Sequence, residues 1–245
     1  MNAETFTERG TPAGPLLCPS CEARNLCFAH GAGAEALAQL DAAVERRIRL
    51  AAGEYLYRVG DPFKSLYAVR SGCLMNSLHD DTGREQVAGF HMLGDVVGVG
   101  GIGHEAYVFD MRALEPSEVC EVPFERLEAL AERVAALRGN ILKIFGRYRN
   151  RDAGTQSLRR KGSAEARVAA FLLDFSGRLE ARGRDAARFR LPMSRADIAS
   201  HLGLSIAAVG RALALLKQRG IASAVRGAVV ISDRAGLQSL AAGRG

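Results

Sequence analysis

Three cysteines near the N-terminus are the residues of this 245-residue chain whose spacing most clearly indicates chemistry. Cys18, Cys21 and Cys27 follow the pattern CxxCx5C within one short segment. The first residues lack the apolar core of a secretory signal, so we expect a cytoplasmic protein, in which disulfides are rare. Closely spaced thiols then indicate metal or redox chemistry, and soft thiolates suit zinc or an iron–sulfur cluster.

A single metal centre on these three thiols needs a fourth ligand, and two residues compete for that position. His30 would complete a local Cys3His zinc site. Cys120 lies in the short strand-like segment 119–122 and would give a four-cysteine cluster that joins the loop to this distant strand. The spacing alone leaves both ligand sets open.

An enzyme with a redox thiol pair at Cys18 and Cys21 is the alternative from another functional class. A thioredoxin-like CxxC pair is followed by a helix within a βαβ unit, and neither signal follows this one. The sequence also shows no paired acid–base constellation. We therefore expect that the protein is not an enzyme.

The positive charge of the chain is concentrated in its C-terminal third. Residues 159–245 contain 16 Lys and Arg against 6 Asp and Glu, whereas residues 1–158 contain 17 against 21. A concentrated basic region is typical of phosphate binding, although a merely basic surface would show the same count. No run of 18 apolar residues is present, so we expect no membrane span.

Local signals in this basic region predict a helix-turn-helix. Ser194 can cap a first helix, with Asp197 three residues on as a variant of the capping box. Gly203 makes the turn, and Ser205 caps a second helix over residues 206–219. Two short helices joined by a glycine turn are typical of DNA-binding domains.

The exposed face of the second helix would enter the major groove of duplex DNA. Arg211 is the only long basic residue on this face and suits bidentate contact with guanine. Segments 221–225 and 228–231 predict a hairpin wing with Arg226 at its tip, against phosphate. A small domain of this shape need not bind DNA, but its capped helices and basic wing together favour it. The predicted DNA contacts are Arg211, Ser205, Arg195, Lys217 and Arg226.

The middle of the chain must supply the scaffold for these sites. Residues 54–58, 65–69 and 85–90 alternate in polarity or are rich in aromatic and β-branched residues, and turn signals separate them. Such closely spaced strands predict a small barrel or jelly roll. We expect an amphipathic helix over 34–48 before this barrel and a long helix over 125–152 after it.

The long helix carries an apolar seam at three- and four-residue spacing, formed by Val134, Leu137, Ile141, Ile144, Phe145 and Tyr148. The seam could pack against the chain's own barrel, but its narrow, long form favours a homodimer. Asp152 continues the same stripe, where it would face its own copy or end the helix in solvent. The predicted dimer interface is Ile141, Ile144, Phe145, Tyr148 and Asp152.

Several motifs together resemble an FNR-type regulator of the CRP/FNR family over nearly the whole chain. They are the cysteine loop ending in Leu26-Cys27 and the segments 64–72, 89–91, 93–95, 119–124, 190–198 and 202–204. The resemblance implies an α+β fold with a cyclic-nucleotide-type β-roll (jelly roll), a long dimerisation helix and a C-terminal winged helix-turn-helix. The expected segments are a cysteine-rich cluster-binding segment at 1–30, the β-roll sensor domain at 31–130, the dimerisation helix at 131–158 and the DNA-binding domain at 159–245.

The resemblance also implies a cofactor and partners. A [4Fe–4S] cluster would be held by Cys18, Cys21, Cys27 and Cys120, and oxygen would convert it and weaken the dimer. In this family a charge such as Asp152 keeps the cluster-free dimer weak. Further implied features are Leu26 as a shield for the cluster, Cys73 as a structural residue, a palindromic DNA site and contact with RNA polymerase.

Two departures from the family pattern bear on ligands and DNA sequence. Cyclic-nucleotide binders carry a Gly-Glu pair and a later Arg followed by Ser or Thr, whereas residues 93–103 and the pair Arg112-Ala113 lack both, so we expect no cyclic nucleotide. The recognition helix of relatives reads Glu-x-x-Ser-Arg. Here Ala207 and Gly210 leave only Arg211, so we expect an altered half-site. The turn at 80–84 also differs from the acidic family version that touches RNA polymerase.

Overall fold

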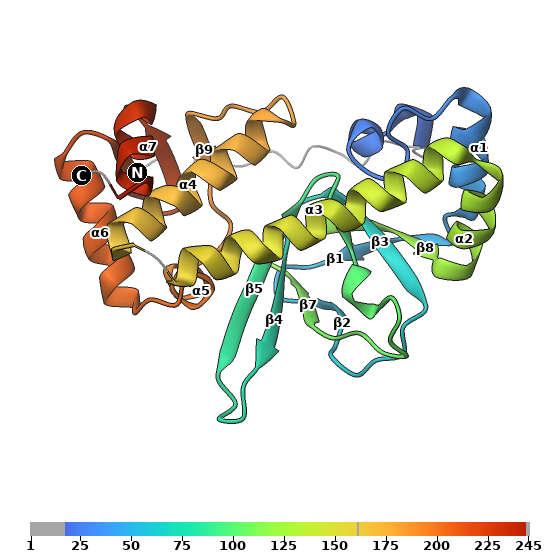
Figure 1. Ribbon diagram of the computed structural model, residues 1–245, viewed down its shortest axis with the longest axis horizontal. Helices are drawn as coiled ribbons and strands as arrows, with labels where there is room; N and C mark the ends of the chain where they lie inside the picture. The colour runs from blue at the N-terminus through green and yellow to red at the C-terminus, as the bar shows by residue number, and fades with distance from the viewer. Residues whose placement is uncertain (1–17, 161, 244–245) are drawn as a thin grey trace, which may run out of the picture.

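The structure is a computed structural model, and it describes residues 18–160 and 162–243. Figure 1 shows a β-roll beside a smaller C-terminal domain, with one long helix crossing the face of the roll from one end of the molecule to the other. The architecture is α+β, as the sequence predicted. The three 3₁₀ turns are Cys18–Ser20, Glu22–Asn25 and Val99–Gly101.

The roll consists of two four-stranded antiparallel sheets. One has the order β1-β8-β3-β6 and the other β2-β7-β4-β5. Because side chains alternate along each strand, Tyr67, Val69 and Val119 point between the sheets. Ala68 and Cys120 belong to a second cluster on the opposite face of the first sheet. The strands are β1 (Arg46–Leu50), β2 (Tyr55–Tyr57), β3 (Ser65–Ser71), β4 (Cys73–His79), β5 (Glu85–Met92), β6 (Val96–Val97), β7 (Asp110–Ala113) and β8 (Ser117–Pro123).

Three tyrosines fill the interior of the roll. The rings of Tyr57 and Tyr107 stack with their centroids 3.9 Å apart, and Tyr67 lies 5.7 Å from Tyr57. All three are buried. Large aromatic rings contribute much of the buried apolar surface of a small domain. The space between the sheets is therefore occupied by the chain's own side chains.

The helices at the edges of the roll differ from the sequence prediction in two places. Helix α1 (Ala34–Ala43) ends earlier than the predicted 34–48 because Val44 turns to an extended conformation and the next residues pair with β8 as β1. The predicted continuous helix over 125–152 is two helices, α2 (Phe124–Arg133) and α3 (Ala135–Arg160). Val134 interrupts it with a φ of −115° and a ψ of 95°.

The C-terminal domain has the predicted helix-turn-helix and wing. Ser194 and Asp197 form a reciprocal capping box at the start of α5, and Gly203 makes the turn with a φ of 65°. The wing strands pair with a short strand before α5, so the sheet order is β10-β11-β9. The elements are α4 (Ala164–Glu180), β9 (Arg188–Arg190), α5 (Arg195–Leu202), α6 (Ile206–Gln218), β10 (Ala222–Val225), β11 (Ala228–Ile231) and α7 (Arg234–Ala241).

The two domains share one hydrophobic cluster. The outer face of β4 and β5 packs against α4 and α5, with Phe90 in ring contact with Phe171 and His201. Arg159, near the end of α3, donates from Nε to the carbonyl of His201 and from Nη2 to that of Val87. The C-terminal domain is thus docked on the roll through both packing and hydrogen bonds.

Within residues 18–160 and 162–243, no single helix is long and apolar enough to cross a membrane. Helices α5 and α6 meet the criteria of length and composition only as a pair, which is bent by 102°.

Candidate functional site

Four cysteines from two distant parts of the chain line one pocket. Cys18, Cys21 and Cys27 come from the loop formed by the first two 3₁₀ turns, and Cys120 comes from β8. Apolar side chains, among them Phe28, surround them. All four thiols are free. The structure therefore brings together the four cysteines that the resemblance implied as cluster ligands.

Hydrogen bonds fix the cysteine loop to helices α1 and α3. The amide of Cys18 donates to Oδ1 of Asp41 at 2.9 Å. Asn140, buried on α3, donates from Nδ2 to the carbonyls of Phe28 at 2.9 Å and His30 at 2.6 Å. The loop is therefore attached directly to the long helix that runs toward the DNA-binding domain.

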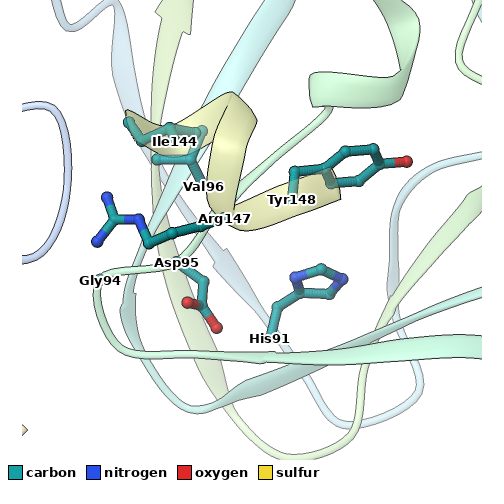
Figure 2. A pocket seen from close by; sticks show the side chains of 7 residues that line it. All are labelled: His91, Gly94, Asp95, Val96, Ile144, Arg147 and Tyr148. Atoms are coloured by element: carbon teal, nitrogen blue, oxygen red, sulfur yellow. The ribbon is translucent and has the colours of Figure 1, made fainter. Parts of the chain in front are cut away.

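Leu26 rests on a glycine of the roll. A Cβ atom added to Gly94 would overlap the Leu26 side chain, and the backbone of Gly94 has a φ of +81°. Only glycine meets both requirements without strain. In Figure 2 Arg147 of α3 extends on the side of Gly94, and its Nη2 donates to the carbonyl of Leu26 at 3.4 Å. The loop, the turn at Gly94 and α3 thus meet at one place.

The environment of the pocket raises the pKa of three of its thiols, those of Cys18, Cys27 and Cys120, and so favours their protonated form when no metal is bound. Burial, followed by a hydrogen bond to Asp41, raises the pKa of Cys18 to about 12. Burial raises the pKa of Cys27 to about 11. Burial also raises the pKa of Cys120, against the opposing charges of Arg70 and Arg47. Since metals bind thiolates, loading of this site must release protons.

The two candidate fourth ligands lie in different surroundings. His30 is exposed, donates from Nδ1 to the carbonyl of Asn25 at 2.6 Å and does not line the pocket, whereas Cys120 does. Within the described ranges, no three His, Cys, Asp or Glu side chains converge closely enough for one metal ion. Four thiols spread around a pocket suit a cluster in which each cysteine binds a different iron.

Cys73 lies apart from this pocket. It is buried at the start of β4, and its thiol donates to the carbonyl of Leu74 at 3.8 Å. It packs in the cluster that joins the roll to the DNA-binding domain. Burial raises its pKa to about 12. A buried, protonated thiol of this kind behaves as a small core residue.

A second site lies on the outer face of α6. Val209, Ala212 and Leu216 are fully buried, which turns Arg211 outward. Ser205 caps the helix by accepting from the amide of Ala208 at 3.1 Å. Every predicted DNA contact is exposed, namely Arg195, Ser205, Arg211, Lys217 and Arg226.

Two features of this face were not predicted. Ile206, the first residue of α6, is 57% exposed, which leaves an apolar side chain open to solvent at the start of this helix. Glu165, at the start of α4, lies close enough to Arg211 and Arg219 for their charges to contribute to its lowered pKa, after hydrogen bonds from its own backbone and from Ser163. The position of Ile206 directly after the capping residue Ser205 could have indicated its exposure from the sequence. The proximity of Glu165 to Arg211 and Arg219 depends on the packing of α4 and α6 and has no such local signal.

The apolar seam of α3 only partly faces outward. Ile144, one of the predicted dimer contacts, is buried against the chain's own roll. Ile141, Phe145 and Tyr148 are half-buried, and Leu142 is 65% exposed. The side chain of Asp152 lies outside the described residues. Ile141, Leu142 and Phe145 instead line a groove of about 520 Å³ between α2 and α3 with Ile102, Phe124 and Arg138.

Family models match both domains. Residues 166–240 match the model of the Crp-like helix-turn-helix domain, and residues 47–134 match that of the cyclic nucleotide-binding domain. Together they cover more than half of the chain.

Curated relatives match over most of their length. The transcriptional activator protein anr of Pseudomonas aeruginosa is 39% identical, with coverage of 99% of this chain and 98% of that protein. The electron transport regulator A of Shewanella oneidensis is 36% identical, covering 91% and 90%. The fumarate and nitrate reduction regulatory protein of Salmonella typhimurium is 35% identical with the same coverage.

Solved structures share the fold. FixK2 from Bradyrhizobium japonicum matches with a TM-score of 0.73 at 27% identity, covering 80% of this chain and 96% of that one. The c-di-GMP-responsive global regulator CLP of Xanthomonas campestris matches with a TM-score of 0.63 at 26% identity, covering 81% and 99%. The order of roll, long helix and helix-turn-helix is thus found in known structures.

Proposed function

Because this chain belongs to the CRP/FNR family of DNA-binding transcription regulators, we propose that it regulates genes in response to oxygen through a [4Fe–4S] cluster on Cys18, Cys21, Cys27 and Cys120. The observation that supports this function is the convergence of these four thiols on one pocket. Relatives named for anaerobic regulation and for fumarate and nitrate reduction point to the same signal. The family consists of regulators, not enzymes.

When bound, the cluster would supply iron–sulfur bonds that oxygen oxidises. A change in the conformation of the cysteine loop would then affect α3 through the hydrogen bonds between them. Cys27 is followed directly by the segment whose carbonyls, at Phe28 and His30, accept from Asn140. Release of the loop removes both acceptors from a buried amide, which is unfavourable unless α3 moves.

Helix α3 connects this loop to dimerisation and DNA binding. Its exposed Leu142 and the groove with Ile141 and Phe145 fit a second copy of the chain, which would pair two recognition helices for a palindromic site. Its C-terminal end holds the DNA-binding domain through Arg159 and the carbonyl of His201. A change at the loop therefore bears on both the dimer groove and the position of α6.

At the DNA we propose that Arg211 reads guanine, with Arg226 of the wing on phosphate. As in the relatives named transcriptional activators, bound protein would contact RNA polymerase in the cytoplasm. The tyrosine-filled interior of the roll supports a signal other than a cyclic nucleotide, since Tyr57, Tyr67 and Tyr107 occupy the space between the sheets.

The test is anaerobic purification of the unmodified chain, followed by iron, sulfide and zinc analysis and visible absorption. We expect brown protein that loses its colour in air and its DNA binding with it. Cys120→Ser should abolish the colour, whereas His30→Asn and the matched control Cys73→Ser should retain it. Colourless anaerobic protein with full zinc occupancy that depends on His30 would overturn the proposal.

A further inference from the structure

Two arginines flank Cys120 on the sheet face that carries the cysteine pocket. Arg47 of β1 is the direct register partner of Cys120 on β8. On the other side of β8, Ala68 of β3 is paired with Cys120, and Arg70 lies two residues further along that strand. The ladder is irregular between Val69 and Ser71, so strand alternation alone does not fix the side of Arg70. Arg70 lines the cysteine pocket with Cys120, and both arginines lie close enough for their charges to lower the pKa of the Cys120 thiol against the effect of burial.

The guanidinium group of Arg70 is buried and incompletely paired. Its side chain is 7% exposed and lines the cysteine pocket. The Nη1 atom is buried and has no hydrogen-bond partner among the described residues. The carboxylate of Glu118 is 4.0 Å from Nε, which is too long for a hydrogen bond. A buried cation in this state is destabilising unless a further negative charge is present.

Arg47 also has a buried donor atom without a hydrogen-bond partner among the described residues. This atom is Nε, and Nη2 reaches Oδ1 of Asp41 only at 3.3 Å. Arg47 lies beside the pocket, and Arg24, which lines it with Arg70, differs because it is exposed and donates to the carbonyl of Pro19 at 2.7 Å. Unused donors thus lie on the sheet side of the pocket, around Cys120, and no carboxylate lines the pocket with them.

We propose that Arg47 and Arg70, next to Cys120, are charge-compensating positioning residues of the cysteine pocket, whose charges and buried donors offset the net negative charge of a cluster held by four thiolates. This inference rests on the proposed function. A cubane with four thiolate ligands is an anion, and anions in a low-dielectric site need nearby positive charge or hydrogen-bond donors. Charges and hydrogen bonds next to the sulfurs are also what sets the reduction potential of such clusters.

Removal of either arginine should have opposite effects on the stability of the cluster-loaded and the cluster-free protein. With the cluster in place, each arginine has a counter-charge, and its removal weakens cluster binding. Without the cluster, Arg47 keeps its contact with Asp41 and Arg70 its long contact with Glu118, but each retains a buried donor without a partner among the described residues, so removal of either one relieves that cost. An arginine that merely packs would stabilise both states alike.

The experiment compares Arg70→Met and Arg47→Met with the unmodified chain, each in the cluster-loaded and the cluster-free reduced form. Arg49→Met is the matched control, since Arg49 lies two residues after Arg47 on β1, is exposed and is not among the groups whose charges act on Cys120. Arg70→Lys keeps the charge. The two readouts are the midpoint potential of the cluster and the thermal midpoint of unfolding of each form.

We expect both methionine variants to shift the potential to more negative values, to lower the thermal midpoint of the loaded form and to raise that of the cluster-free form. Arg70→Lys should restore the potential most of the way, and Arg49→Met should change neither readout. Unchanged potentials, or thermal shifts of the same sign in both forms, would overturn the inference while leaving the cluster itself established. Failure of the unmodified chain to bind a cluster would overturn both proposals, and that result is seen before any variant is made.

Discussion

Asp95, in the turn after β5, accepts a hydrogen bond from Nη2 of Arg178 on α4 at 2.7 Å. Its second oxygen accepts from Nη2 of Arg182 at 2.8 Å. The carboxylate is 9% exposed, so this is a buried ion pair between the roll and the DNA-binding domain. The turn that holds Asp95 is the one whose Gly94 supports Leu26, so the cysteine loop and the DNA-binding domain meet on consecutive residues.

Replacement of Asp95 should uncouple the two domains. Asp95→Ala removes the buried counter-charge of Arg178 and leaves only the exposed Asp174 beside it, and we expect a loss of about 3–5 kcal/mol in the free energy of unfolding by denaturant titration. Asp174→Ala is the control, because that carboxylate is 59% exposed and pairs with the same arginine four residues away. It should cost under about 0.5 kcal/mol. Equal losses in both variants would contradict the role of Asp95.

Gly94→Ala should displace the cysteine loop. The added Cβ overlaps Leu26, and the positive φ adds about 1–2 kcal/mol of backbone strain. Gly83→Ala is a control for strain alone, since Gly83 has a φ of +76° but open space around it. We expect faster alkylation of Cys27 under anaerobic conditions in Gly94→Ala than in Gly83→Ala. Identical alkylation rates would show that the contact with Leu26 does not hold the loop.

Asn140→Ala should loosen the loop from α3. Two carbonyls lose their donor, and removal of such hydrogen bonds costs about 0.5–1.5 kcal/mol each. We expect amide hydrogen exchange to rise at residues 26–31 and on α3, measured by mass spectrometry. Asn150→Ala, on the exposed side of the same helix, is the control and should change neither region. Increased exchange at the loop with no change on α3 would exclude Asn140 as the coupling residue.

Arg211→Ala should remove sequence discrimination while leaving salt-sensitive DNA binding. Loss of a bidentate guanine contact costs about 1–3 kcal/mol of discrimination, which is measurable by competition between selected and random duplexes. Arg226→Ala, in the wing, should instead weaken binding to all sequences and reduce the slope of log K against log salt by about 1. A selection from random DNA that returns the same site for Arg211→Ala would assign base reading to another residue.

His201 should make the protein less stable in mildly acidic solution. Burial lowers its pKa to about 4, with the charge of Arg159 as the next cause, whereas the unfolded value is near 6.5. As the pH falls from 6.5 to 4, the unfolded chain takes up a proton that the folded chain refuses, so stability decreases by on the order of 2–3 kcal/mol over this window. His201→Phe keeps a ring between Phe90 and Phe171 and should show a shallower dependence in denaturant titrations. The same slope in both proteins would contradict this assignment.

Local signals predicted much of the fold because they act over short distances. The capping box of Ser194 and Asp197 and the glycine turn at Gly203 determine the helix-turn-helix through neighbouring residues alone. The apolar seam was less informative, because periodicity shows which face is apolar but not what covers it. Ile144 therefore belongs to the chain's own core, and the exposed Leu142 beside it was not predicted.

Contacts between residues far apart in the sequence could not be predicted from the periodicity of apolar residues. Residues 46–48 fall within the predicted helix because their strand character depends on pairing with β8, more than 60 residues later. The meeting of Leu26 with Gly94, and of Asn140 with the cysteine loop, likewise depends on how α3 crosses the roll. Residue type and spacing identify Cys18, Cys21 and Cys27, whereas Cys120 is indicated by the family resemblance and not by local pattern.

Helix α3 contacts the cysteine loop through Asn140 and the C-terminal domain through Arg159, so a tilt of the helix at the loop would displace its far end. From Asn140 to Arg159 its axis is about 28 Å long at the usual rise per residue, so a tilt of about 5° at the loop would move the Arg159 end by about 2 Å. Arg159 donates to the carbonyl of His201, in the last turn of the helix that precedes the recognition helix. A displacement of about 2 Å exceeds the spread of ordinary hydrogen-bond distances, so under the proposed function a small movement at the cysteines would be enough to break base-specific contacts on DNA.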